Sequence, residues 1–258
     1  MNTARDKNKK KLALITGGSR GIGAAISGRL AADGFEVILT GRHSSTLKVE
    51  CDRIVSLGGA ASFIKADLAK TDEVLNLCRK IRTHYKRVDL LINNAGFGGP
   101  FHKVNEISEK EWDMIFQVNL KSSFLLCKDI LPLMKKSGFG RVINISSVQG
   151  LFGAESSSTY ASSKHALLGF TRSVAAEWGQ FGITCNVICP GFIDTEMLVG
   201  HRARKSAKLK ALLRRIPIGR FGTPEEIAAI VSLLCSPTGG YFNGSVITVD
   251  GGLSAHID

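Results

Sequence analysis

Residues 11–23 read KLALITGGSRGIG, an apolar run that passes directly into a turn with glycines at positions 17, 21 and 23. The run has the length and composition of a buried β-strand, and the following AAISGRLAADG predicts a helix. Glycine has no side chain, so the backbone can turn sharply and approach a pyrophosphate at the helix N-terminus. The spacing differs from the common G-x-G-x-x-G, but the strand–turn–helix order predicts dinucleotide binding. A P-loop is excluded, because Gly-Lys followed by Ser or Thr is absent.

The rest of the chain repeats this alternation of short apolar runs and helical segments. Seven runs predict strands, at 11–16, 36–40, 61–66, 88–94, 141–146, 183–190 and 245–250. Several are apolar nearly throughout, as expected for parallel strands covered on both faces. Capping boxes at Ser108 and Thr223, the second followed by Pro224, predict helix starts. We therefore predict an α/β fold: a single-domain Rossmann-type doubly wound sheet of about seven parallel strands with helices on both faces, spanning residues 1–258.

The composition is that of a globular protein with a substantial core, since 44% of the 258 residues are hydrophobic and 22% are charged. No signal peptide and no run of 18 apolar residues is visible, so we expect a cytoplasmic protein without a membrane partner. The six cysteines form no C-x-x-C pair and the six histidines have no ligand spacing. The sequence therefore predicts reduced thiols and no metal site.

The net charge of +12 indicates attraction to anions such as a phosphorylated cofactor or an acidic protein. The excess is concentrated in KNKKK at 7–11, which overlaps a basic N-terminal arm (1–10), and in HRARKSAKLKALLRR at 201–215. A nucleic-acid-binding module is a rival hypothesis. Aromatic residues make up only 7% of the chain, however, and no recognition motif interleaves with the charge, so we expect no nucleic-acid partner.

Charge also indicates which dinucleotide binds. NAD-dependent enzymes usually place a carboxylate at the end of the second strand, to accept hydrogen bonds from the adenosine ribose. Here that stretch reads VILTGRHSS, with Arg42 and no acid, and Arg20 in the glycine loop can approach the same place. Two arginines suit the 2′-phosphate of NADP(H), although Arg42 could also point into solvent.

The stretch STYASSK (158–164) places Tyr160 and Lys164 four residues apart, on one face of a predicted helix. Taken alone, the pair could lie on the surface. A tyrosine pKa near 10 must fall by about three units to approach neutrality, which requires roughly 4 kcal/mol. An ammonium about 4 Å away supplies about that much at an effective dielectric constant of about 20. The spacing thus predicts a tyrosine whose pKa is lowered by the lysine, able to donate and accept protons.

With these elements in order, the chain resembles the short-chain dehydrogenase/reductase family over essentially its whole length. The resemblance is carried by TGGSRGIG, Asp67-Leu68, NNAG (93–96), Asn119 in QVNLKSS, Ser147 in INISSVQG, YASSK, and PG followed by FIDT (190–195). It implies NADP(H)-dependent transfer of a hydride to a carbonyl. Tyr160 would be the acid or base, Ser147 would donate a hydrogen bond to the substrate oxygen, and Asn119 would hold a water that relays protons to Lys164. Ser147 could instead cap a strand end, and Asn119 could mark a helix kink.

The resemblance also implies contacts to the cofactor. Lys164 would hold the nicotinamide ribose beside Tyr160, and the glycine loop would hold the pyrophosphate. Asp67 and Leu68 would lie at the adenine, although Asp67 could also be a helix cap. The full set implied is Gly17, Ser19, Arg20, Gly21, Ile22, Gly23, Arg42, Asp67, Leu68, Asn94, Ala95, Gly96, Tyr160, Lys164, Ile193 and Thr195.

The substrate is less well defined. Residues 196–216 predict a helical lid with a basic face, which could receive coenzyme A phosphates or an acyl carrier protein, or could simply be solvated. Its apolar side would contain Leu198, Val199, Leu209, Leu212 and Leu213. Within the family the chain is most similar to 3-oxoacyl-[acyl-carrier-protein] reductases, but the ending GRFGTPEEIA…ITVDGG also occurs in members acting on sugars, steroids and small ketones. Basic surface at Lys135, Lys136 and Arg141 matches no specific docking site.

The resemblance further implies a homotetramer built on helices at 108–136 and 158–180 and on the last strand. A non-catalytic scaffold with the same fold is the remaining alternative, and the presence of all four catalytic residue types counts against it.

Overall fold

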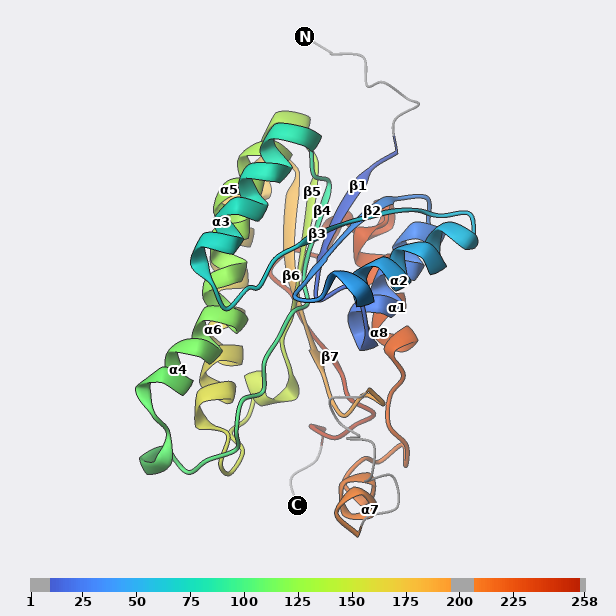
Figure 1. The fold of residues 1–258 in the computed structure, drawn as a ribbon. Helices are drawn as coiled ribbons and strands as arrows, with labels where there is room; N and C mark the ends of the chain where they lie inside the picture. The colour runs from blue at the N-terminus through green and yellow to red at the C-terminus, as the bar shows by residue number, and fades with distance from the viewer. Residues whose placement is uncertain (1–9, 196–206, 256–258) are drawn as a thin grey trace.

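The structure, a computed structural model, describes residues 10–195 and 207–255. Most of the predicted basic arm and the first half of the predicted lid, with Leu198 and Val199, lie outside the described residues. The described chain forms one sheet with helices on both of its faces (Figure 1).

The predicted sheet is confirmed: seven parallel strands lie in the order β3-β2-β1-β4-β5-β6-β7. The strands are β1 (Leu12–Thr16), β2 (Glu36–Gly41), β3 (Ala60–Lys65), β4 (Leu90–Asn93), β5 (Gly140–Ile145), β6 (Ile183–Pro190) and β7 (Val246–Val249). The strand order reverses between β1 and β4: β2 and β3 follow on one side of β1, and β5 to β7 follow on the other side of β4. The loops after β1 and β4 therefore face each other at the carboxyl edge of the sheet. Ligands of doubly wound sheets bind at such a switch point.

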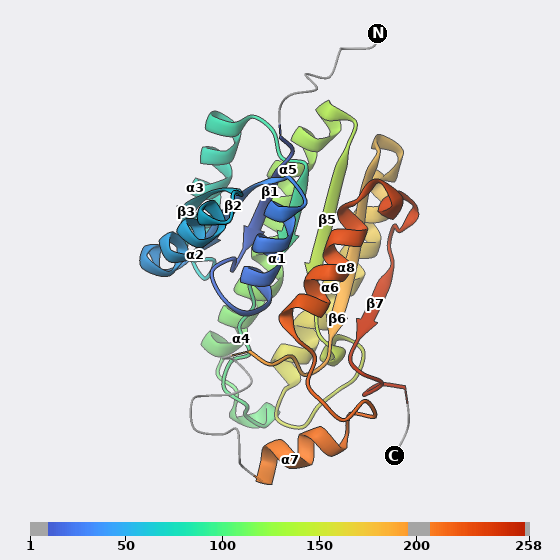
Figure 2. The same cartoon turned by 90° about the vertical axis from the view of Figure 1, so that its right-hand side faces the viewer.

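The helices form two layers, one on each face of the sheet (Figures 1 and 2). One layer holds α1 (Gly21–Ala32), α2 (Ser44–Ser56) and α8 (Pro224–Cys235); the other holds α3 (Thr71–Lys80), α5 (Ser122–Ser137) and α6 (Ser158–Trp178). Two further helices, α4 (Glu109–Phe116) and α7 (Ala207–Arg214), lie toward the carboxyl edge. Short 3-10 turns are η2 (Val104–Glu106), η4 (Val148–Gly150), η5 (Gly179–Phe181) and η6 (Pro237–Tyr241), and π-helical turns are η1 (Ile81–Tyr85) and η3 (Gln117–Lys121).

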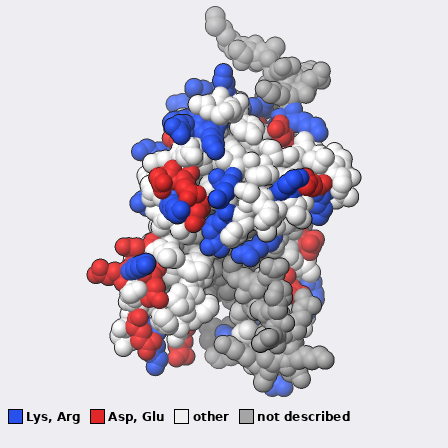
Figure 3. All heavy atoms as spheres, in the orientation of Figure 1, with Lys and Arg blue, Asp and Glu red and all other residues white. Residues whose placement is uncertain are grey.

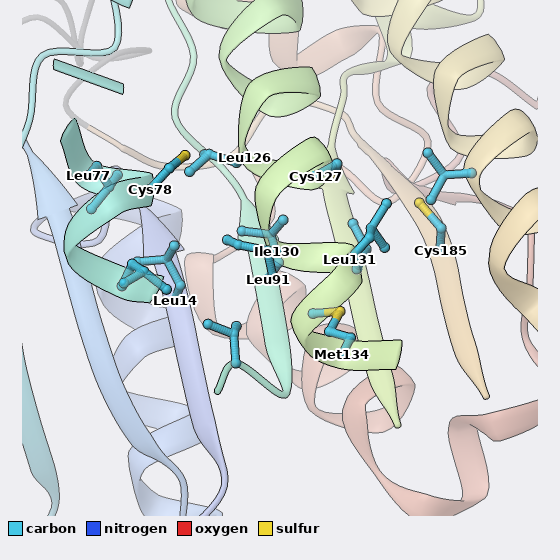
Figure 4. Packing of buried hydrophobic residues seen from close by; sticks show 14 of the residues in the cluster. Leu14, Leu77, Cys78, Leu91, Leu126, Cys127, Ile130, Leu131, Met134 and Cys185 are labelled. Carbon is cyan, nitrogen blue, oxygen red and sulfur yellow. The ribbon is translucent and has the colours of Figure 1, made fainter. Parts of the chain in front are cut away.

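Alternate residues of each buried strand supply two cores, one under each helix layer. Leu12 and Leu14 of β1 pack with α3 and α5, whereas Ala13 and Ile15 pack with α1 and α8. Figure 4 shows the first core, in which side chains from α3, β4 and α5 meet between Leu14 and Cys185. Because both faces are covered, the strands carry the nearly continuous apolar sequences from which the parallel sheet was predicted.

Both predicted capping boxes are present. The Ser108 and Thr223 hydroxyls accept hydrogen bonds from the backbone amides of Glu111 and Glu226, whose carboxylates bind back to the amides of the capping residues. These bonds fix where α4 and α8 begin, because they satisfy amides that have no partner within the helix.

All six cysteines are buried and unpaired. Burial raises the thiol pKa of each, to about 11 for Cys51 and to about 12 for Cys78 and Cys127. Within the described residues, no helix is both long and apolar enough to cross a membrane. On the face shown in Figure 3, acidic side chains gather over the region of α4, while Lys and Arg are frequent around the amino edge of the sheet.

Candidate active site

The glycine loop between β1 and α1 has a backbone that only glycine adopts easily. Gly17 and Gly21 have φ angles of 64° and 52°, in the left-handed region. A Cβ on Gly23 would lie 2.0 Å from the Gly17 carbonyl oxygen. A Cβ on Gly18 would lie 2.9 Å from Leu39 Cγ. The loop thus folds back on itself, and at its glycines it presents backbone rather than side chains at the carboxyl edge of the sheet.

The N-terminus of α1 is suited to an anion. Among the described residues no side chain caps this helix, and its first turn contains no acid. The first amides of α1 therefore keep their hydrogen-bonding capacity at the positive end of the helix dipole. The Ser19 hydroxyl accepts a hydrogen bond from Thr46 Oγ1 in the first turn of α2 (3.4 Å). Ile22 packs against the core under the helix layer of α1, α2 and α8.

Thr16 joins the glycine loop to the loop after β4. Its hydroxyl oxygen accepts hydrogen bonds from the backbone amides of Asn94 (3.0 Å) and Ala95 (2.9 Å). The Asn94 side chain donates to the carbonyl oxygen of Thr16 (2.9 Å). Asn94, Ala95 and Gly96, three of the predicted cofactor contacts, are thereby held beside the glycine loop, across the switch point of the sheet.

Arg42 and Asp67, which are predicted to contact the adenosine end of the cofactor, follow the neighbouring strands β2 and β3. The Gly17 amide donates to the Thr40 carbonyl (2.8 Å), and the Ala66 amide donates to the Gly41 carbonyl (3.0 Å). Arg42 is exposed, as is Arg20.

Asp67 is not the cap of a helix: its carboxylate accepts from the Ala69 amide (3.1 Å), while Lys70 is the N-cap of α3. The Leu68 side chain packs into the core, and its carbonyl accepts a hydrogen bond from the Gln117 side chain (3.1 Å).

Ile193 and Thr195 follow β6 on the far side of the glycine loop. Ile193 is buried and pairs with Gly222 in an isolated parallel bridge. Thr195 lies against the loop, because a Cβ on Gly21 would be 3.3 Å from Thr195 Cγ2. Ile193 and Thr195, two of the predicted cofactor contacts, are therefore brought to the same place as the predicted pyrophosphate contacts.

Tyr160 and Lys164 lie one turn apart near the start of α6. Lys164 is 3% exposed, and its ammonium nitrogen Nζ donates to the carbonyl of Ile145 at the end of β5 (2.8 Å). The same nitrogen lies 5.6 Å from the centroid of the Tyr160 ring. Ser147, just after β5, makes a side-chain hydrogen bond with Tyr160. Its oxygen also accepts from the Gln149 amide (3.1 Å), so Ser147 caps η4 as well.

Asn119 lies in the π-helical turn η3, so the predicted helix irregularity is present at this residue. Its side-chain oxygen accepts from the Phe97 amide (2.8 Å), and its nitrogen donates to the Phe97 carbonyl (3.1 Å) and to Ser163 (3.0 Å). A Cβ on Gly96 would lie 3.4 Å from Lys164 Nζ and 3.7 Å from Asn119 Oδ1. Asn119 therefore holds the loop after β4 close to Lys164.

The predicted direction of the Tyr160 pKa is wrong for this structure. Burial raises the pKa of the phenol above its usual value of 10, and the hydrogen bond from Ser147 opposes this only in part. Burial also lowers the pKa of Lys164 to about 8. The physical reason is that both groups lose water, while the lysine ammonium is directed to a backbone carbonyl and not to the phenolic oxygen.

Several residues that position the site were not predicted. Thr16 holds two amides of the loop after β4, and Ser163 links α6 to Asn119 while donating to the Tyr160 carbonyl (2.7 Å). Asn93 donates to Asn144 (2.8 Å), which donates to Thr171 of α6 (2.8 Å). The only sequence signal for these residues is a polar side chain inside a buried element.

The predicted lid is described from residue 207 onward. Leu212 and Leu213 of α7 are half-buried, whereas the basic residues Arg214 and Arg215 that follow are exposed. The segment after α7 is anchored where the Ile218 amide donates to the Gly251 carbonyl (3.2 Å). Figure 2 shows α7 below the carboxyl edge, on the side where the site residues lie. In the described part of the chain, no group of three His, Cys, Asp or Glu side chains could hold a metal ion.

Comparison with known proteins identifies relatives over nearly the whole length. A family model described as "Enoyl-(Acyl carrier protein) reductase" matches residues 17–254. The 3-oxoacyl-[acyl-carrier-protein] reductase FabG of Escherichia coli is 38% identical over 243 residues, which are 94% of this chain and 97% of the relative. A 3beta-hydroxysteroid dehydrogenase of Mediterraneibacter gnavus is 32% identical over 269 residues, 96% of each chain.

Two solved structures have the same fold. A candidate NAD(P)-dependent gluconate 5-dehydrogenase of Beutenbergia cavernae, with bound NADP, has a TM-score of 0.90 at 33% identity and covers 95% of this chain and 97% of its own. An actinorhodin polyketide ketoreductase variant with NADPH has a TM-score of 0.89 at 30% identity and covers 96% and 98%. The names of these four relatives specify different substrates, so similarity alone does not identify the substrate of this chain.

Proposed function

Because the chain belongs to the short-chain dehydrogenase/reductase family and is an oxidoreductase, we propose that it uses NADPH to reduce a ketone to a secondary alcohol, with a 3-oxoacyl thioester as substrate. One observation carries this proposal: Ser147, Tyr160 and Lys164 come together where β5 ends, on the same edge of the sheet as the glycine loop. A hydride acceptor placed there would have a proton donor and a hydrogen-bond donor within reach.

The described residues fit a dinucleotide. When bound, NADPH supplies the hydride. The glycine loop and the uncapped start of α1 would hold the pyrophosphate, since the loop folds tightly at Gly17, Gly21 and Gly23 and no described side chain caps the first amides of α1. Arg20 and Arg42 would bind the 2′-phosphate, which suits a pair of exposed arginines at a strand end without a carboxylate. Bound NADP and NADPH in the two related structures support this assignment.

Tyr160 would donate the proton in the reductive direction. Its raised pKa keeps the phenol protonated at neutral pH, so a proton is available when negative charge develops on the carbonyl oxygen. Ser147 would donate a second hydrogen bond to that oxygen, because its own oxygen is already fixed by the Gln149 amide. Both donors would then stabilise the charge in the transition state.

Lys164 would hold the nicotinamide ribose and return protons to Tyr160. With a pKa of about 8 the ammonium is mostly charged at pH 7, yet it can release a proton at modest cost. One of its hydrogens is used by the Ile145 carbonyl, which leaves two for the ribose and for a relay near Asn119.

The thioester assignment is supported by relatives and by charge. Several relatives of similar length are 3-oxoacyl-[acyl-carrier-protein] reductases, including those of Synechocystis and Escherichia coli. The basic lid segment would receive a phosphate-bearing carrier, either acyl carrier protein or coenzyme A. The enzyme would act in the cytoplasm as a homotetramer.

The experiment is the initial rate of cofactor oxidation with acetoacetyl-coenzyme A, measured with NADPH and NADH in parallel. We expect turnover with NADPH and at least tenfold less with NADH. Absence of turnover, with NADPH bound tightly, would refute the thioester substrate but leave the reductase chemistry standing.

The steroid dehydrogenase relative and the gluconate dehydrogenase-like structure favour a second candidate, reduction of a steroid or sugar ketone. A panel of 3-oxosteroids and 5-ketogluconate under the same conditions separates this candidate from the first. A kcat/KM for any of these that exceeds the value for acetoacetyl-coenzyme A would select it.

A further inference from the structure

A cavity of about 500 Å³ opens at the amino edge of the sheet, at the end opposite to the candidate active site. Its wall is formed by the starts of β5 and β6 and by the turn before β7. The six residues of β5 separate this cavity from the Ile145 carbonyl that binds Lys164, a distance of roughly 20 Å at about 3.3 Å per residue. The volume lies within the usual range for small-molecule sites, about 300–1,000 Å³.

Arg141 lines this cavity and is only 6% exposed, so its assignment to the basic surface from the sequence was wrong. Its Nη1 donates to the carbonyls of Gly140 (2.9 Å) and Gly182 (3.5 Å), and its guanidinium carbon lies 4.5 Å from the centroid of the Phe139 ring. Its Nε is buried without a hydrogen-bond partner, and Nη2 has none among the described residues. A Cβ on Gly240, another lining residue, would be 3.3 Å from Nη2.

The charge of Arg141 is also unmatched. Within residues 10–195 and 207–255 no carboxylate forms an ion pair with it, and burial lowers its pKa. Asp89, whose backbone carbonyl accepts from the Arg141 amide (2.9 Å), has a carboxylate that is already bound by Arg87 (2.7 Å) and by the Leu12 amide (2.8 Å). A buried cation without a counter-ion is costly, which makes the binding of an anion favourable at this place.

Thr184, on the same wall of the cavity, has a second buried polar group without a hydrogen-bond partner among the described residues. It is the register partner of Arg141 across β5 and β6, so both side chains project from the same face of the sheet. The hydroxyl of Thr184 is buried, with the residue 6% exposed, and has no hydrogen-bond partner. Tyr241, fully exposed, stands at the rim.

We propose that this cavity is a second binding site, for a small organic carboxylate. The Nε and Nη2 edge of Arg141 would hold the two carboxylate oxygens side by side, and Thr184 would donate a third hydrogen bond. Phe139 and Tyr241 would contact the flat organic body of the ligand. A carboxylate matches the planar edge of a guanidinium better than a rounder anion does, so inorganic phosphate should bind less well. This proposal is independent of the reductase assignment.

The test is isothermal titration of the full chain, saturated with NADPH, with sodium benzoate at constant ionic strength set by chloride. We expect saturable binding of one benzoate per chain in the millimolar range. Arg141→Lys, which removes the two-pronged edge, and Gly240→Ala, which adds a methyl group beside Nη2, should each weaken binding at least tenfold. Thr184→Val should weaken it about threefold. The control Gly169→Ala adds a methyl group that meets nothing within 4 Å and should leave binding unchanged.

Three results would overturn the proposal. Equal heats from benzoate and chloride would show that no site exists, and tighter binding of inorganic phosphate would show that its ligand class is wrong. The third is loss of assembly in Arg141→Lys by light scattering, which would show that a carboxylate of a second copy binds this arginine. Because Arg141→Lys could fail to fold, retained NADPH binding is required of every variant, and Gly240→Ala keeps the test decisive without altering the arginine.

Discussion

Single side chains at the end of β5 carry the chemistry that we propose, and their protonation follows from burial more than from their mutual attraction. A buried phenol with a raised pKa and a buried lysine with a pKa of about 8 form a pair in which both groups are mostly protonated at neutral pH. This arrangement favours proton donation, and hence reduction.

Replacing Tyr160 by Phe should lower kcat for ketone reduction by roughly 100- to 10,000-fold, the range for a lost general acid, because the substitution removes the phenol that would donate the proton. NADPH binding, measured by fluorescence titration, should change less than threefold. Tyr85→Phe is the matched control, since this phenol bonds to Ser62 (3.3 Å) on β3 and should leave turnover unaltered. Unchanged turnover in Tyr160→Phe would refute the mechanism.

Arg42→Ala should raise the Kd for NADPH by roughly 10- to 100-fold, as expected from losing a charge-assisted hydrogen bond. The Kd for NADH should change less than threefold, because NADH has no 2′-phosphate. Arg79→Ala, an exposed arginine on α3, serves as the control for total charge. If the affinities for NADPH and NADH fall equally in Arg42→Ala, the 2′-phosphate binds elsewhere.

Lys164→Met should stabilise the fold at pH 7. The lysine pKa falls from 10.5 to about 8 on folding, so burying the ammonium costs roughly 3 kcal/mol. Because the folded pKa is the lower one, this cost is fully present below pH 8 and disappears as the pH rises toward 10.5. Urea unfolding should therefore show a higher free energy of unfolding for Lys164→Met than for the wild type at pH 7, and a smaller difference at pH 10. Lys80→Met, exposed on α3, should show no such trend.

At the scale of elements, the site depends on how two loops are joined across the switch point. Thr16 at the end of β1 binds two amides of the loop after β4, and Asn119 in the π-helical turn binds both backbone groups of Phe97 in that loop. The loop is therefore fixed from two directions, and its Gly96 lies against Lys164.

Thr16→Val should destabilise the protein by about 2–5 kcal/mol and raise the Kd for NADPH, because two amides lose their acceptor. The chain offers a close control in Thr40, which is the register partner of Thr16 on β2 and has a buried hydroxyl without any partner. Thr40→Val should be neutral or stabilising by up to about 1 kcal/mol. Denaturant unfolding of both variants measures the two changes in the free energy of unfolding. Equal changes would mean that the hydrogen bonds of Thr16 contribute little to stability.

The elements differ in how far the sequence specifies them. The strands and the starts of α4 and α8 were predictable, because apolar runs and capping boxes are local patterns. A helix kink was one of the two interpretations of Asn119, but its π-helical form was not predictable, since the turn depends on contacts of Asn119 with Phe97 and Ser163. The Tyr160 pKa was predicted in the wrong direction, because burial depends on packing that the motif does not encode.

At the scale of the whole molecule, the surface over α4 and α5 carries apolar side chains that a monomer would leave in water. Trp112, Met114 and Phe124 are 40%, 38% and 45% exposed. We expect this surface to be buried between copies in a homotetramer of four 27.7 kDa chains.

Phe124→Glu should shift the mass measured by light scattering from four chains to fewer, because a charge would be buried at the interface. Val55→Glu, on the opposite helix layer at α2, is the control and should leave the mass unaltered. A monomeric wild-type protein would contradict the prediction outright.

The six buried cysteines have a practical consequence. Thiols react as thiolates, and all six have raised pKa values and lie in the packed layers of the sheet. Alkylation by iodoacetamide should therefore be slow in the native protein and accelerate only when a helix layer separates from the sheet. Mass spectrometry of alkylated peptides over time would then rank the layers by how often each opens, with Cys51 and Cys235 marking one layer and Cys78 and Cys127 the other.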